Sequence, residues 1–157
     1  SSTSQLTAND ALDLKLLISD NRAEDSLQVA LTKYAKADLL AFQNKNDVAI
    51  TILNQVLEEH KTEVIVPQAL LKQALLFERK QDFDNAKSNY QRIIKDFKDS
   101  ILMDNALYNL AELFVNQLAQ PEEAKKLYEA ILFNHSDSIF AVESRKKFRA
   151  LRGDALN

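Results

Sequence analysis

Residues 86–101, "AKSNYQRIIKDFKDSI", and residues 124–139, "AKKLYEAILFNHSDSI", are two versions of one pattern. Each begins with an alanine, places a tyrosine four residues later, and continues with an aliphatic pair at the next turn. Apolar side chains at this spacing lie on one face of an α-helix. The second version starts 38 residues after the first, so the sequence contains an internal repeat with a helix in each unit.

The repeat includes a second helix and a third copy. A weaker version starts at Ala49, and a separate apolar stripe upstream of the three versions places Ala37, Ala74 and Ala111 in register. Each unit therefore has two amphipathic stripes joined by a polar segment, which predicts a helical hairpin. A side chain larger than alanine would separate the two helices where they cross, so we expect Ala74 to face Ala86.

Composition narrows the fold and the chemistry. The 157 residues include one glycine, two prolines and no cysteine. Because β-rich folds need glycine in their turns, we expect a nearly all-helical fold, and glycine-rich phosphate loops are excluded. The absence of cysteine excludes disulfides, thiolate nucleophiles and cysteine metal sites. A formal net charge of −3 argues against a nucleic-acid partner, and no apolar run reaches the roughly 18 residues of a membrane span.

The central unit, residues 69–94, "ALLKQALLFERKQDFDNAKSNYQRII", resembles the tetratricopeptide repeat. It has a small residue midway along its first helix (Ala74), an acidic-aromatic-acidic turn (residues 82–84), then Ala86 and the aromatic Tyr90. The resemblance implies an all-α fold, a right-handed superhelix of antiparallel helical hairpins. This TPR-like α-solenoid would contain about three repeats plus a terminal capping helix.

The resemblance divides the chain into three parts. Residues 26–152 are expected to form the repeat array with its C-terminal capping helix, and residues 153–157 a tail. Residues 1–25 are expected to hold a disordered start, a helix cap at Thr7 and an N-terminal helix. That helix is either the remnant of a preceding repeat or a dedicated cap. Self-association through this N-terminal end, with the assembly itself as the function, is an alternative to partner binding.

The joints between units are longer than those of most tetratricopeptide repeats. The period of 37 to 38 residues exceeds the usual one of about 34, and the extra residues lie in joints such as residues 97–105, "FKDSILMDN". Such joints are similar to those of longer-period repeats in bacterial envelope proteins, including the outer-membrane assembly lipoprotein and the periplasmic partner of the Tol system. This resemblance favours the bacterial periplasm or cell envelope over the cytoplasm, and implies the terminal part of a larger bacterial protein.

The family pattern also places a binding surface. The first helices of such arrays line a concave groove that binds a protein or peptide partner. Tyr34 and Asp38 stand where members that clamp a terminal carboxylate use lysine and asparagine, so that clamp is not expected. The resemblance implies a non-catalytic scaffold for a peptide with apolar anchors and basic residues, unless Tyr34, Leu71 and Tyr108 pack against a neighbouring hairpin. The groove positions carried over to this chain are Tyr34, Asp38, Phe42, Leu71, Leu75, Glu78, Arg79, Tyr108, Glu112 and Asn116.

The C-terminal segment begins a further unit. Ser144 is in register with Ala106, and Phe148 with Leu110, which predicts a capping helix with one polar side. Gly153 is typical of a helix end, and the cations before it lie at the favourable end of the helix dipole. The basic cluster is either this solvated polar side or an anion site for phospholipid, nucleic acid or an acidic protein surface. The candidate anion-binding residues are Arg145, Lys147 and Arg149.

The sequence predicts no enzyme, and no catalytic residue, cofactor site or metal site. Catalysis needs a nucleophile or base that converges with an orienting group, and no motif of that kind is present. The two histidines, His60 and His135, occupy the repeat position that Phe97 fills in the remaining unit. We therefore expect both histidines to pack at the end of a helix rather than to bind a metal.

Overall fold

The computed structural model describes residues 8–154, with side chains described from residue 24 onwards. The predicted disordered start, the cap at Thr7 and the last three residues of the predicted tail lie outside the described residues. Within residues 8–154 the chain forms seven α-helices and no strand. The helices are α1 (Ala8–Phe42), α2 (Asn46–Glu59), α3 (Val66–Arg79), α4 (Phe83–Asp96), α5 (Met103–Asn116), α6 (Pro121–Asn134) and α7 (Ala141–Arg152).

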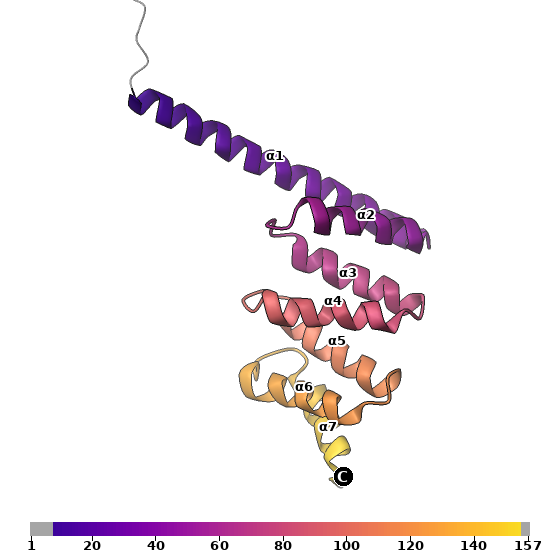
Figure 1. The fold of residues 1–157 in the computed structure, drawn as a ribbon. Coiled ribbons are helices and arrows are strands. Elements are labelled where there is room, and N and C mark those ends of the chain that lie inside the picture. The colour runs from indigo at the N-terminus through magenta and orange to yellow at the C-terminus, as the bar shows by residue number, and fades with distance from the viewer. Residues whose placement is uncertain (1–7, 155–157) are drawn as a thin grey trace, which may run out of the picture.

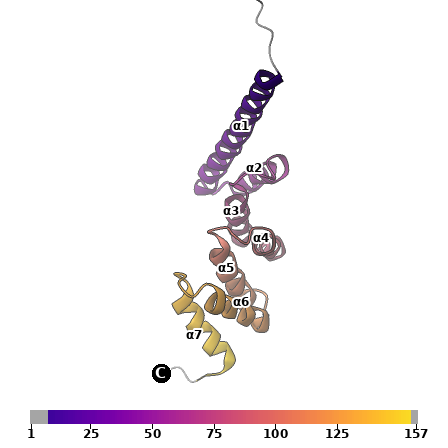
Figure 2. The same ribbon diagram turned by 90° about the vertical axis from the view of Figure 1, so that its left-hand side faces the viewer.

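Each helix packs against the next one along the chain, and the stack follows chain order from α1 to α7 (Figures 1 and 2). The pairs α1–α2, α3–α4 and α5–α6 form three hairpins, and α7 packs against α6. This arrangement confirms the predicted all-α array of TPR-like hairpins with a terminal helix. Among the described residues, no helix combines the length and the apolar character that a membrane crossing needs.

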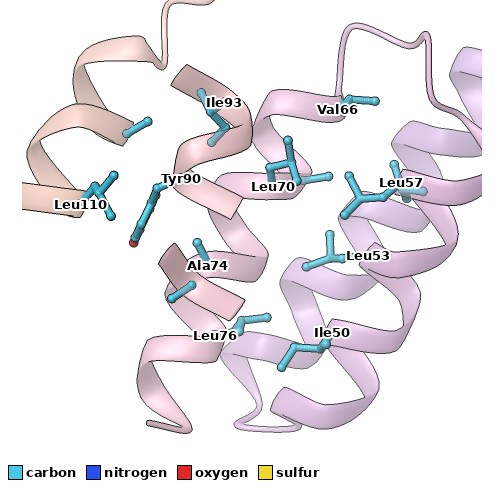
Figure 3. Packing of buried hydrophobic residues seen from close by; sticks show 14 of the residues in the cluster. Ile50, Leu53, Leu57, Val66, Leu70, Ala74, Leu76, Tyr90, Ile93 and Leu110 are labelled. Atoms are coloured by element: carbon cyan, nitrogen blue, oxygen red, sulfur yellow. The ribbon is translucent and has the colours of Figure 1, made fainter. Parts of the chain in front are cut away.

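The small and aromatic residues of the repeat form the core. Ala74, Ala86, Ala111 and Ala124 are fully buried, as expected for positions where helices approach closely. Tyr90 is also fully buried, and Figure 3 shows it extending from α4 towards Leu110 of the neighbouring helix α5. Alanine therefore sets the close approach within a hairpin, whereas the tyrosine fills the wider space between hairpins.

The hairpin turns explain how a chain with one glycine reverses direction. Asn44, Gln81 and Ala119 follow the ends of α1, α3 and α5, and all three have positive φ, at 61°, 61° and 51°. Asp82 then caps α4 by accepting a hydrogen bond from the Asn85 N–H at 3.3 Å. Each non-glycine residue in the left-handed region costs roughly 1 kcal/mol or more. Packing of the hairpins must offset this cost at every turn.

The first helix continues across a predicted boundary. We expected a separate N-terminal helix before residue 26, but α1 runs without interruption from Ala8 to Phe42. Its N-terminal half extends beyond α2, as Figure 1 shows. The boundary between residues 25 and 26 thus lies inside a helix rather than in a joint. The division of the chain into domains stays a prediction.

Candidate functional site

The first helices α1 and α3 form a cleft of about 350 Å³ near their C-terminal ends. Phe42 is 87% exposed at this cleft and Leu39 is 57% exposed. Three of the predicted groove residues line it, and the full lining consists of Ala35, Asp38, Leu39, Ala41, Phe42, Lys72 and Arg79. The two helices thus present apolar and charged groups to one concave surface, which we call the α1–α3 cleft.

The charges at the α1–α3 cleft are not balanced. Lys72 Nζ lies 2.6 Å from Asp38 Oδ1, so these two side chains neutralise each other across the cleft. Arg79 is exposed and forms no ion pair with any residue from 24 to 154. The cleft therefore offers one guanidinium beside exposed apolar side chains. A guanidinium can receive a carboxylate through two parallel hydrogen bonds.

The other predicted groove residues of α1 and α3 are mostly engaged within the fold. Tyr34 and Leu71 are half-buried and pack against the core. Glu78 accepts a hydrogen bond from the hydroxyl of Tyr90, whose burial and bond to Glu78 raise the pKa of that hydroxyl. Leu75 is the member of this group that stays exposed. The part of the groove that can meet a partner is therefore narrower than the predicted set.

Two of the three groove positions of α5, Tyr108 and Glu112, contact the C-terminal segment, whereas Asn116 stays exposed. Tyr108 stacks on Phe140 with ring centroids 4.6 Å apart and an angle of 17° between the planes. Lys147 Nζ lies 5.8 Å from the centroid of the Tyr108 ring, within the range of a cation–π contact. Phe140 precedes α7 and Lys147 lies on it. The last helix thus closes this end of the groove.

Glu112 joins three elements at the closed end. Its carboxylate accepts hydrogen bonds from the Tyr128 hydroxyl at 2.6 Å, from Lys147 Nζ at 2.5 Å and from the Asn116 amide at 3.2 Å. Burial acts to raise the pKa of Glu112, but the bonds from Lys147 and Tyr128 outweigh burial and hold the pKa below its ordinary value. Burial, together with the hydrogen bond to the Glu112 carboxylate, raises the pKa of Tyr128. Glu112 is therefore a structural anion rather than a free acid in the groove.

The predicted anion-binding residues do not come together. Lys147 points to Glu112 and the Tyr108 ring, on the groove side of α7. Arg145 and Arg149 are exposed and lie one helical turn apart on α7, on a different face from Lys147. Sequence reasoning also missed Leu39 and Lys72 at the α1–α3 cleft. The one signal in the sequence that could have identified Leu39 is its apolar side chain at a position outside the buried stripe of α1.

The histidines lie at helix ends. His60, Phe97 and His135 are the residues that follow α2, α4 and α6, so the expected equivalence of these three positions is confirmed. His60 Nδ1 lies 3.1 Å from Ser26 Oγ, and His135 Nδ1 lies 2.8 Å from Asp104 Oδ1. Within the part of the chain whose side chains are described, no group of three or more His, Asp or Glu residues is placed to hold a metal ion.

An array of antiparallel helical hairpins with an exposed row of first helices defines the class of α-solenoid scaffolds. The tetratricopeptide repeat family model matches residues 68–100 and 105–138, which cover most of α3–α4 and α5–α6. These two hairpins are thus similar to the tetratricopeptide repeat, a unit that generally mediates protein–protein interaction. The comparison with curated proteins found no significant match. The longer-period envelope subfamily stays a prediction from the joints.

Proposed function

We propose that this protein is a non-catalytic scaffold that binds a protein or peptide partner at the α1–α3 cleft. The observation that carries the proposal is the cleft itself, where Phe42 and Leu39 stand exposed beside Arg79. Burying an exposed aromatic or aliphatic side chain against a partner contributes roughly 1.5 to 3 kcal/mol. Two such anchors and one guanidinium form the kind of small, central cluster that dominates binding energy in protein interfaces.

The charges of the cleft favour an acidic group on the partner. Basic residues were expected on the ligand, because Asp38, Glu78 and Glu112 occur among the groove positions. Each of these carboxylates already accepts a hydrogen bond or forms an ion pair within the chain. Arg79 is the charged group of the cleft that is left for a ligand. The expected ligand is a segment with apolar side chains next to a carboxylate.

The proposed setting is a larger bacterial assembly, in the periplasm or cell envelope. The long joints between repeats support this setting through their resemblance to envelope proteins. Their length also changes the geometry between hairpins, because three or four extra residues separate each second helix from the next first helix.

The test compares three forms of the chain immobilised for capture of partners from a bacterial lysate. The intact chain is compared with the cleft variant Phe42→Ala/Arg79→Glu. The matched control, Phe133→Ala/Lys95→Glu, makes the same types of change at exposed positions on the second helices α6 and α4. Circular dichroism first establishes that all three are equally helical. A partner retained by the control and lost by the cleft variant supports the proposal, whereas a partner retained by both variants contradicts it.

A second candidate function is self-assembly through α1. The helical backbone of its N-terminal half extends beyond α2 and leaves room for another chain to pack beside it (Figure 1). Light scattering across a range of concentrations would distinguish the two functions. A mass that rises with concentration and falls back when residues 8–23 are deleted would favour self-assembly over the scaffold.

A further inference from the structure

Helix α7 occupies the place of a first helix in a fourth hairpin. It follows α6 as α5 follows α4, and its buried Ala141 and Ser144 stand in register with the buried Met103 and Ala106 of α5. The register identifies the positions through which each first helix meets its own second helix. These hairpin-contact positions are Leu70, Ala74 and Phe77 on α3, Leu107, Ala111 and Phe114 on α5, and Arg145, Arg149 and Arg152 on α7.

The hairpin-contact positions differ sharply between α7 and the earlier helices. Those of α5 are buried, and those of α3 are buried or half-buried, because a second helix covers them. All three arginines of α7 are exposed. Arg152 binds Asp154 two residues further on, whereas Arg145 and Arg149 form no ion pair with any residue from 24 to 154. We call Arg145, Arg149 and Arg152 the arginine face of α7.

The spacing of the three arginines on α7 suits a helix as the binding partner. Residues four and three apart lie on one side of a helix, so three guanidinium groups follow one line about 10 Å long. Val142, 60% exposed, extends the same line towards the N-terminus of α7. An antiparallel partner helix that places acidic residues at i, i+3 and i+7 would match this line group for group.

The first hairpin provides an example of such a contact within this molecule. Lys33 of α1 stands at the register position of Leu70, Leu107 and Arg145. Its Nζ lies 2.5 Å from Oε2 of Glu59, which belongs to the second helix α2. A cation at this position therefore receives a carboxylate from the helix that covers it.

The arginines also exclude an ordinary second helix. Arg149 replaces the alanine that lets α3 and α5 approach their partners closely. A helix with a small-residue stripe, such as α4 or α6, could not approach α7 to the same distance. A helix with long acidic side chains could, because its glutamates would meet the arginines across the wider gap.

We propose that the arginine face of α7 binds an acidic helix of a partner protein, which takes the position on α7 that α4 and α6 take on α3 and α5. This surface is separate from the α1–α3 cleft, and either can fail without the other. The charge complementarity predicts binding that weakens as salt rises, because the arginines are exposed to solvent.

The test uses two synthetic helical peptides of about 20 residues and equal composition. One carries glutamates at i, i+3 and i+7 along one face, and the other carries the same glutamates spread around the helix. Binding to the full chain is measured by fluorescence anisotropy. We expect the one-faced peptide to bind at least about tenfold more tightly, which corresponds to about 1.4 kcal/mol.

Two variants identify the surface. Arg145→Glu/Arg149→Glu is expected to weaken binding of the one-faced peptide by at least about tenfold, through loss of two pairs and added repulsion. The control Lys146→Glu/Lys98→Glu makes the same charge change at exposed positions outside the arginine face, and it should change binding less than about threefold. All four residues are exposed, so both variants should keep the helicity of the intact chain.

Four results would overturn the proposal. They are equal binding of the two peptides, no binding of either, an equal effect of the two variants, and an Arg145→Glu/Arg149→Glu variant that binds normally.

Binding to vesicles of phosphatidylserine and phosphatidylcholine tests whether the arginine face has a different ligand. If the arginine variant loses vesicle binding while the peptides bind equally, the face is an anionic-lipid site. If the mass of the intact chain rises with concentration and that of the arginine variant does not, the occupant is a second copy of this chain.

Discussion

The groove positions at the two ends of the row of first helices differ in whether their side chains are free to contact a partner. At the α1–α3 end, Asp38 pairs with Lys72 on the surface, and Phe42 and Arg79 stay exposed. At the α5 end, Glu112 is held by Tyr128 and Lys147, and Phe140 stacks on Tyr108. Register alone therefore does not assign a binding role. What lies beside a groove position decides whether it can meet a partner.

The largest expected effect comes from removing the aromatic residue that anchors the closed end. Tyr128 is fully buried and donates a hydrogen bond to Glu112, so Tyr128→Ala should lower the free energy of unfolding by about 3 to 5 kcal/mol. At the α1–α3 cleft, which is the open end, Phe42→Ala removes an exposed ring and should change the free energy of unfolding by less than about 0.5 kcal/mol. Urea unfolding measures both. Similar losses from the two substitutions would contradict the contrast between the ends.

A smaller loss of stability is expected from substitutions at the alanine position that the two repeats share. Ala74→Leu and Ala111→Leu each place a large side chain at a fully buried hairpin contact. Overpacking should cost about 1 to 3 kcal/mol in both hairpins, measured as a lower melting temperature and urea midpoint. An unchanged midpoint for either variant would mean that its alanine does not lie at a close helix contact.

The carboxylates at the two ends, Glu112 and Asp38, should contribute different amounts to the free energy of unfolding. Glu112→Gln loses charged acceptors for Tyr128 and Lys147 and should cost about 1 to 2 kcal/mol. Asp38→Asn disrupts a surface ion pair with Lys72 and should cost no more than about 1 kcal/mol. The two variants are compared by urea unfolding at neutral pH. A larger loss for Asp38→Asn would reverse the assignment of closed and open ends.

The smallest expected effect is a dependence on pH. The pKa of Glu112 is lower in the folded chain than its ordinary value of 4.5, so its stabilisation is fully present above that value. The stabilisation is lost as pH falls through the lowered pKa, because the protonated carboxyl no longer attracts Lys147. The stability difference between the intact chain and Glu112→Gln should therefore shrink below about pH 4.5. A difference that stays constant from neutral to acidic pH would rule out this linkage.

The hairpins were predictable because their causes are local and periodic. Alanine at the helix crossing and tyrosine one turn later recur at a fixed interval, and both follow from the space between neighbouring helices. The continuity of α1 was not predictable in this way. A polar run at residues 20–25 interrupts the apolar pattern, but polar residues do not end a helix that lacks a breaker.

The candidate site was predictable only in part. Asp38, Phe42 and Arg79, three of the groove positions carried over from the family pattern, line the α1–α3 cleft, and their role in binding stays a prediction. The closure of the α5 end depends on Lys147, which is 35 residues from Glu112, and such a contact leaves no local pattern in one sequence. The same contact separated Lys147 from the arginines with which the sequence had grouped it.

The most direct test of partner binding at the open end is site-specific photo-crosslinking in the presence of the captured partner. A photoreactive residue is placed at Leu39 in the α1–α3 cleft, at Asn116 at the end of α5, or at Phe133 on the outer helix α6. We expect a crosslink to the partner from Leu39 and none from the other two positions. A crosslink from Asn116 or Phe133 with none from Leu39 would contradict it.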